Sequence, residues 1–320
     1  MWLVADIGGT NARFALVDGP GAVPRDVTIL PGKDYNRLAP AVNAYLAHVG
    51  CRSITALCAA VAGPVEGDHV VLTNSLWDFS IEETQQALGI QKVSIINDFH
   101  ALALSLPRLP QNELLAIGGG NAMPGFAMCV VGPGTGLGTG TLLPMEGRWI
   151  AVPGEGGHVS CPAVSEKELA VFEHMRDQQG AVTAECFLCG DGLIRLYNSH
   201  AAVQGARVDV LNATHITERG LSGCDLLAVE TLEMFCAMLG SVAANVALIT
   251  GARGGVFLGG GILPCLPEFL LKSEFRARFD ANVRMTDYLK NIPVQLIMCE
   301  TPALYGAAAW LDDWQNYGSR

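Results

Sequence analysis

The chain has 320 residues, half of them hydrophobic, with 20 Lys and Arg against 31 Asp and Glu, a net charge of −11. This length predicts two domains, since a domain commonly spans roughly 100–200 residues. The negative charge argues against nucleic acid and anionic membranes as partners. Gly and Pro interrupt the apolar stretches, so we expect none to reach the ~18–20 residues of a membrane span. The sequence around residues 1–10 lacks the features of a signal peptide, and we expect a cytoplasmic protein with reduced cysteines.

The first elements predicted in chain order form a β-hairpin. Apolar-rich runs at 2–7 and 12–18 are joined by GGTN, and Gly and Asn favour tight turns. Ser80 and Glu83 have the spacing of a helix N-cap with a capping box. The sequence then predicts helices over 34–49, 80–89 and 99–106 and strands over 54–62, 69–74 and 92–97.

Pro, Gly and Asn are concentrated in the stretch 107–125, which we interpret as the crossing between domains. We expect a small α/β domain over 1–108, completed by a C-terminal helix over 300–320, and a large α/β domain over 109–299. Within the large domain, the sequence predicts strands over 126–132, 141–152, 254–260 and 293–299, with helices dominating 165–251.

The pattern of strand, Gly/Thr turn and strand occurs twice. The first turn follows Asp6, and a carboxylate is unfavourable in a buried strand unless it has a task; the second turn is GPGTGLG, at 132–138. An ordinary hairpin turn explains the glycines equally well. The alternative is a pair of anion-binding nests, in which backbone N–H groups approach a phosphate. Neither the Walker motif nor the dinucleotide fingerprint is present.

Five segments, taken together and in order, resemble the bacterial glucokinases, a sugar-kinase family of the actin-like ATPase superfamily. They are DIGGTNARFAL, IINDF, GPGTGLG, PGEGGH and GGVFLGGGI. The resemblance implies a two-lobed α/β fold of ribonuclease-H-like topology, with the active site in the interdomain cleft. It also implies ATP-dependent phosphorylation of glucose on its 6-hydroxyl, with Mg²⁺, by a homodimer.

The resemblance assigns the nucleotide side of this site to the glycine-rich segments. It implies that the two turns hold the phosphates, that Asp6 orients Mg²⁺ through water, and that the adenosine lies against the segment GGVFLGGGI. The residues so assigned are Asp6, Gly8, Gly9, Thr10, Asn11, Gly134, Thr135, Gly136, Gly254, Gly255 and Gly260.

On the sugar side, Asn97 and Asp98 stand where an apolar strand ends and a helix begins. They are good helix N-cap residues, and Asp98 is equally placed to act as a general base, the role that the resemblance implies. Glu155 and His158 lie in a glycine-rich loop, which is either a flexible solvated loop or part of a pocket for sugar hydroxyls. The resemblance alone implies that Glu185 is a further acceptor for sugar hydroxyls.

Cys186 and Cys189 form a C-x-x-C pair, which can indicate zinc or redox chemistry. We disfavour both, because no second tight Cys pair is present. Three other functions remain open at this point: a kinase of another hexose, a nucleotide switch without sugar chemistry, and a sugar-sensing regulator. A nucleotide switch has no use for the set Asn97, Asp98, Glu155 and His158, and we disfavour the regulator because we see no basic helix-turn-helix segment in the sequence.

Overall fold

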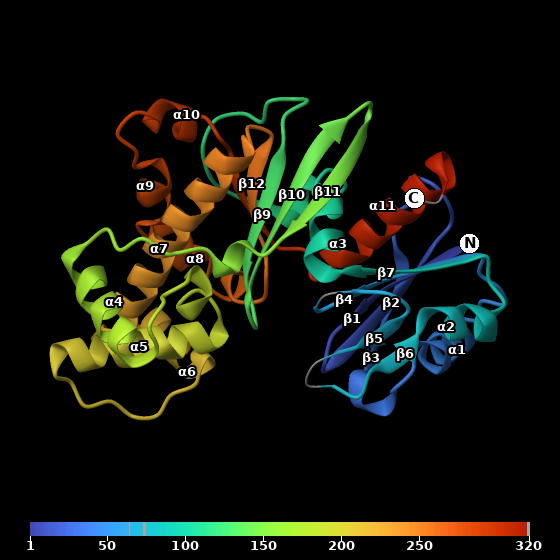
Figure 1. Ribbon diagram of the computed structural model, residues 1–320, viewed down its shortest axis with the longest axis horizontal. Coiled ribbons are helices and arrows are strands. Elements are labelled where there is room, and N and C mark those ends of the chain that lie inside the picture. The colour runs from blue at the N-terminus through green and yellow to red at the C-terminus, as the bar shows by residue number, and fades with distance from the viewer. Residues whose placement is uncertain (64, 73–74, 319–320) are drawn as a thin grey trace. The chain divides into compact units, whose positions relative to one another are not determined.

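The computed structural model describes residues 1–63, 65–72 and 75–318 (Figure 1). Pro64 in the predicted loop after residue 62, and Thr73 and Asn74 in the strand predicted over 69–74, lie outside the described residues. The chain divides into two compact units. The first comprises Met1–Gln111, Trp149–Pro153 and Cys299–Arg320, and the second comprises Asn112–Arg148 and Gly154–Met298.

A five-stranded sheet in the order β3-β2-β1-β4-β7 forms the centre of the first unit. Its strands are β1 (Trp2–Ile7), β2 (Asn11–Val17), β3 (Arg25–Pro31), β4 (Ala56–Val61) and β7 (Lys92–Asn97). The predicted hairpin is confirmed, since β1 and β2 are antiparallel, whereas β4 is parallel to both β1 and β7. Every residue of β4 is buried, as expected of a strand covered on both faces.

Four α-helices cover this sheet, two on each face (Figure 1). They are α1 (Leu38–His48), α2 (Ile81–Leu88), α3 (Asp98–Ser105) and α11 (Pro302–Tyr317), accompanied by a small sheet of β5 (His69–Val71) and β6 (Asp78–Ser80) and by 3-10 turns at Gly32–Asp34 and Gln111–Glu113. Ser80 caps α2 as predicted, its Oγ accepting from the Glu83 N–H at 3.0 Å. α11 packs against α3 so closely that a Cβ on Gly306 would lie 1.7 Å from the Ala101 carbonyl oxygen.

The second sheet has six strands in the order β11-β10-β9-β12-β13-β8. They are β8 (Leu114–Gly118), β9 (Met128–Pro133), β10 (Leu137–Met145), β11 (Arg148–Gly154), β12 (Gly255–Leu258) and β13 (Val294–Ile297). As in the first sheet, an antiparallel hairpin is followed by two parallel pairings, β9 with β12 and β12 with β13. The ribonuclease-H-like strand order therefore occurs twice, as the repeated turn pattern suggested.

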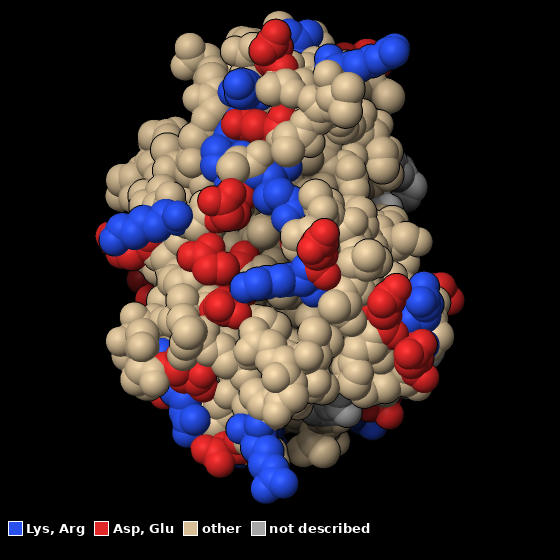
Figure 2. Space-filling view, turned by 90° about the vertical axis from the view of Figure 1, so that its left-hand side faces the viewer, with Lys and Arg blue, Asp and Glu red and all other residues tan. Residues whose placement is uncertain are grey.

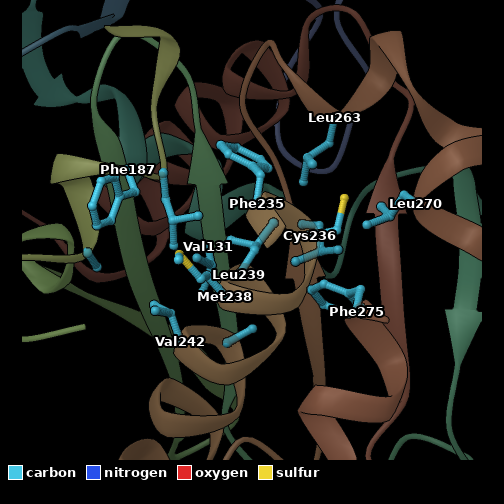
Figure 3. Close-up of a cluster of buried hydrophobic side chains, with 14 of the residues drawn as sticks. Val131, Phe187, Phe235, Cys236, Met238, Leu239, Val242, Leu263, Leu270 and Phe275 are labelled. Atoms are coloured by element: carbon cyan, nitrogen blue, oxygen red, sulfur yellow. The ribbon is translucent and has the colours of Figure 1, made fainter. Parts of the chain in front are cut away.

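The second unit is rich in helices. They are α4 (Glu166–Gln179), α5 (Gly190–Gln204), α6 (Ala213–Ser222), α7 (Leu226–Thr250), α8 (Pro267–Lys272), α9 (Phe275–Asp280) and α10 (Thr286–Lys290), with 3-10 turns at Gly156–His158, Ala184–Cys186 and Leu263–Cys265. α7 is the central helix, and its Phe235, Leu239 and Val242 lie in one apolar cluster with Val131 of β9 (Figure 3).

Contrary to the expectation from the sequence, α7 is long and apolar enough, by length and composition alone, to cross a membrane. Most of its apolar window is buried inside the structure, and α5, α6 and α9 pack against it. Burial against these helices accounts for its apolar composition, because a helix that is hydrophobic all round is typical of the core of a large unit.

Charged side chains of both signs are interspersed on the face shown in Figure 2. Close ion pairs in the second unit include Arg278 with Glu168 at 2.7 Å and Arg276 with Asp280 at 2.6 Å. This face therefore does not present the continuous basic stripe that binding to a phosphate backbone requires.

Candidate active site

In the first unit, the candidate residues gather at one edge of the sheet. Ile7, Val61 and Asn97 occupy neighbouring positions at the ends of three parallel strands, β1, β4 and β7. Because parallel strands end at the same edge, this register brings Asp6, Asn97 and Asp98 together. Ligands of open α/β sheets bind at this edge.

The Asn97 side chain is an N-cap of α3. Its Oδ1 accepts from the N–H groups of Phe99 at 2.9 Å and His100 at 3.1 Å. Its Nδ2 donates to the Gly63 carbonyl oxygen at 3.1 Å. The capping interpretation is thus confirmed. The amide is fixed in orientation, and its hydrogen bond to the Asp98 carboxyl lowers the pKa of that group.

Asp98 is the first residue of α3, half-buried, with its Oδ1 accepting from the Phe99 N–H at 2.9 Å. The pKa of this carboxyl is raised to about 6, mainly by burial and also by the negative charge of Asp6, against the hydrogen bond from Phe99. A carboxylate with a pKa near neutrality can both exist as the base at working pH and hold a proton well.

Asp6 is held by Arg13 on the neighbouring strand, with Nη1 3.3 Å from Oδ2. Burial raises the pKa of the Asp6 carboxyl, and the Arg13 charge and hydrogen bond act in the opposite direction. Arg13 was not singled out from the sequence. The available signal was its position opposite Asp6 in the predicted hairpin.

The first Gly/Thr turn is closed by its own backbone. The Gly8 N–H donates to the Asn11 carbonyl at 2.9 Å, and the Gly32 N–H donates to the Thr10 carbonyl at 2.8 Å. Gly9 and Thr10 are exposed, and their N–H groups have no hydrogen-bond acceptor within residues 1–63, 65–72 and 75–318. Adjacent exposed amides of this kind form an anion-binding nest.

The second turn has the same construction in the second unit. The Gly134 N–H donates to the Gly136 carbonyl at 2.8 Å, which closes the turn, and Thr135 is exposed. The Gly190 N–H, in the first turn of α5, donates to the Gly134 carbonyl at 2.8 Å. The positive end of the α5 dipole therefore adjoins the turn and favours negative charge there.

Of the three glycines predicted to lie against adenosine, only Gly260 is near this turn. Its φ is +78°, and a Cβ there would lie 2.3 Å from the Pro133 carbonyl oxygen. Gly254 and Gly255 are buried at the opposite end of β12, and their assignment to the nucleotide stays a prediction. Close packing also requires a small residue there, since a Cβ on Gly254 would lie 2.6 Å from the Phe126 carbonyl oxygen.

The loop with Glu155 and His158 is held against β10. Thr139 is buried, and its Oγ1 accepts from the Gly156 N–H at 3.0 Å and donates to the Gly154 carbonyl at 3.3 Å. A Cβ on Gly157 would lie 2.1 Å from the Leu137 carbonyl oxygen. The glycines therefore permit close packing, while Glu155 and His158 are exposed. The loop is therefore anchored to β10, which disagrees with the interpretation of it as a flexible solvated loop.

Glu185 lies on the 3-10 turn Ala184–Cys186, which contacts the turn Gly156–His158. Its Oε2 accepts from the Leu137 N–H at 2.7 Å. The Ala184 N–H donates to the Val159 carbonyl at 2.9 Å, which ties the two segments together. The second unit thus brings Glu155, His158 and Glu185 onto segments anchored at the start of β10.

The two cysteines of the C-x-x-C pair are bonded locally. The Cys189 Sγ accepts from the Gly192 N–H at 3.2 Å as the N-cap of α5, and the Cys186 Sγ accepts from the Thr183 N–H at 3.4 Å. In the part of the chain that the structure describes, no three His, Cys, Asp or Glu residues are grouped so that they could hold a metal ion.

Three comparisons connect this geometry with known proteins. A sequence model of the family described as Glucokinase matches residues 3–314. The glucokinase of Chromobacterium violaceum is 46% identical over 311 residues, covering 97% of this chain and 89% of that protein. The crystal structure of a glucokinase from an Antarctic psychrotroph has a TM-score of 0.91 at 37% identity, covering 98% of both chains. A ROK family glucokinase from Streptomyces griseus, solved with glucose and AMPPNP, shares the fold at a TM-score of 0.62 and 19% identity, covering 96% of this chain and 98% of that one.

Proposed function

The chain belongs to the glucokinase family, and from that membership we propose how its residues phosphorylate glucose with ATP. The observation that carries the proposal is the Asp98 carboxylate, which stands at the carboxyl edge of three parallel strands with its pKa raised to about 6. It accepts the proton of the glucose 6-hydroxyl as the hydroxyl oxygen attacks the γ-phosphorus.

Phosphoryl transfer has a loose transition state, so the protein contributes mainly by positioning and by stabilising charge. In our proposal the exposed N–H groups of Gly9 and Thr10 and the N–H groups of Thr135 and Gly136 donate to the phosphates of ATP. The N-terminus of α5 adds a favourable field at the second turn. Local donors of this kind bind a polyphosphate even in a chain with a net charge of −11.

Asp6 fits the Mg²⁺ that accompanies ATP. Mg²⁺ is commonly held by one or two carboxylates, with water and substrate phosphates completing its shell, and so needs no larger cluster of protein ligands. Burial raises the pKa of Asp6, which means that its charge is poorly solvated and would gain from a nearby cation. When bound, Mg²⁺ neutralises phosphate charge, and Arg13 holds the carboxylate in place for it.

Glucose is recognised through its hydroxyl groups, each of which donates and accepts. We assign the acceptors to Glu155 and Glu185, a donor to the side-chain amide of Asn97, and either function to His158. The anchoring of Glu155 and His158 by β10 supports this assignment, because a site that binds through hydrogen bonds needs its polar groups fixed in advance.

The decisive experiment replaces Asp98 by Asn and measures turnover with glucose and ATP. We expect a loss of at least ~10²-fold in kcat with nucleotide affinity retained. Near-native turnover would rule out the base. A panel of glucose, mannose, fructose and N-acetylated hexosamines with the unchanged enzyme tests the sugar, and a Glu155→Gln variant should mainly raise KM for glucose.

We also propose that the protein is a cytoplasmic homodimer, which rests on the sequence and its family resemblance. Light scattering after size exclusion should give twice the 33.8 kDa of one chain. A mass of one chain at micromolar concentration would contradict the dimer without touching the catalytic assignment.

A further inference from the structure

The nucleotide turn and the sugar residues of the second unit are joined through one carboxylate. Glu185 was assigned to the sugar, and Gly136 to the phosphates. In the structure, Glu185 Oε2 accepts from the Leu137 N–H, which directly follows Gly136, at 2.7 Å. A hydrogen bond from a neutral N–H to a carboxylate is one of the stronger kinds in proteins.

Gly136 leaves the space that this carboxylate occupies. A Cβ on Gly136 would lie 2.5 Å from Glu185 Oε2 and 3.3 Å from its Cδ. The φ of Gly136 is outside the left-handed region, so its backbone accepts an alanine without strain. The conflict is therefore with Glu185 alone among the contacts that an added Cβ would make.

We propose that Gly136 is a positioning residue for glucose, acting through Glu185. The turn fixes Oε2 with the Leu137 N–H and keeps clear the volume beside it, and Oε1 is then presented to a sugar hydroxyl. Glu185 is thus shared between the two substrates, and the geometry of the phosphate turn sets the affinity for sugar. This inference rests on the proposed role of Glu185 in binding glucose.

The neighbouring glycine provides a matched control. A Cβ on Gly134 would have its nearest neighbour, the Gly261 N, at 3.9 Å, which is ordinary van der Waals contact. The φ of Gly134 is also outside the left-handed region. Both glycines belong to one turn, so both replacements disturb the approach of phosphate, but only the one at Gly136 pushes against Glu185.

The experiment measures glucose binding by calorimetry without nucleotide, so that effects on phosphates do not enter. Gly136→Ala should weaken glucose binding at least ~10-fold, the equivalent of one lost hydrogen bond to a charged group, while Gly134→Ala should change it less than ~2-fold. Thermal unfolding of each variant establishes that it is folded. Equal glucose affinity of the two variants would overturn the proposal.

A double-mutant cycle separates this inference from the function on which it rests. In a Glu185→Ala background, Gly136→Ala should have almost no further effect, because the group that it displaces is gone. If Glu185→Ala alone leaves glucose affinity unchanged, Glu185 does not bind sugar. The assignment of Glu185 to glucose and the positioning role of Gly136 then both fail. If it weakens binding but the two effects add fully, only the positioning role of Gly136 is overturned.

Should Gly136→Ala fail to fold, Glu185→Asp gives an independent test. The shorter side chain keeps its charge but withdraws from the Leu137 N–H. We expect at least ~10-fold weaker glucose binding, and unchanged affinity would contradict the proposal.

Discussion

The negative charge of Asp6 raises the pKa of Asp98. Asp6 lies near the end of β1, and Asp98 lies where β7 ends and α3 begins. Burial is the larger cause of the shift, and together they place the pKa of Asp98 at about 6. A carboxylate beside the base at one sheet edge therefore helps to keep the base protonated to a higher pH.

This relationship predicts a pH dependence of catalysis. Only the ionised form of Asp98 accepts a proton, so kcat/KM for glucose should fall about tenfold per pH unit below about 6. A pH–rate profile at saturating ATP measures this limb, with coupling enzymes in excess at every pH. Activity that stays level down to pH 5 would contradict the assigned base.

The same shift predicts that Asp98→Asn stabilises the protein. The pKa of Asp98 rises from 3.8 to about 6 on folding, so the folded state binds more protons between these values, and stability declines as pH rises through this window. Above pH 6 ionised Asp98 lowers the free energy of unfolding by its full amount. This amount is on the order of 1–3 kcal/mol after allowance for solvent screening at this half-buried group. Denaturant unfolding at pH 7.5 and pH 4 should show a gain that is large at the higher pH and small at the lower.

Asp68→Asn serves as the control for this stability measurement. Hydrogen bonds from Ser80 and the Glu82 N–H lower the pKa of Asp68 in the folded protein. Its ionised form therefore adds stability above its ordinary pKa, and the replacement should lower stability at pH 7.5. Gains in both variants would show that removal of any negative charge stabilises this acidic chain.

Thr139 is predicted to act on sugar affinity through the loop that it anchors. Thr139→Val removes the acceptor for the Gly156 N–H and the donor to the Gly154 carbonyl, at nearly constant volume. We expect a several-fold higher KM for glucose, a kcat changed much less, and a stability loss of about 1–3 kcal/mol, because two hydrogen bonds are lost. Thr139→Ser retains the hydroxyl, and its KM for glucose should be close to that of the unchanged enzyme.

Gly306→Ala should disturb Asp98 from a distance. The new Cβ would lie 1.7 Å from the Ala101 carbonyl oxygen, so α11 and α3 must separate, and α3 begins with Asp98. Overpacking of this kind costs roughly 1–3 kcal/mol or more, and we expect kcat to fall with it. Gln315→Ala, at an exposed position of the same helix, is the matched control for urea unfolding and should differ little from the unchanged chain.

The sequence predicted those elements whose patterns reflect burial. The strands predicted at 2–7, 54–62 and 92–97 carry apolar residues that pack in the cores, and all three are present, as is the long apolar helix α7 within the predicted helical region 165–251. β3 was missed because it is an edge strand with few buried positions, and its Val27 and Ile29 are exposed. An apolar pattern cannot reveal a strand whose side chains face water on both sides.

The site shows the same division between local and distant signals. The N-cap of Asn97 depends on residues next to it in the chain and could be predicted. The contact between Glu185 and Leu137 joins positions 48 residues apart, and only folding reveals it. The close approach of Gly254 to the Phe126 carbonyl oxygen likewise joins distant positions, and the sequence alone does not reveal it.

The glycines after β12 provide a last test, since adjacent positions have opposite requirements. Gly260→Ala introduces a side chain at φ +78° and 2.3 Å from the Pro133 carbonyl oxygen, whereas a Cβ on Gly261 would meet nothing within 4 Å. We expect Gly260→Ala to cost about 1–3 kcal/mol of stability and to raise KM for ATP, because Pro133 precedes the turn Gly134–Gly136. Gly261→Ala should leave the free energy of unfolding nearly unchanged. If the two variants unfold alike, close approach to Pro133 is not what requires a glycine at 260.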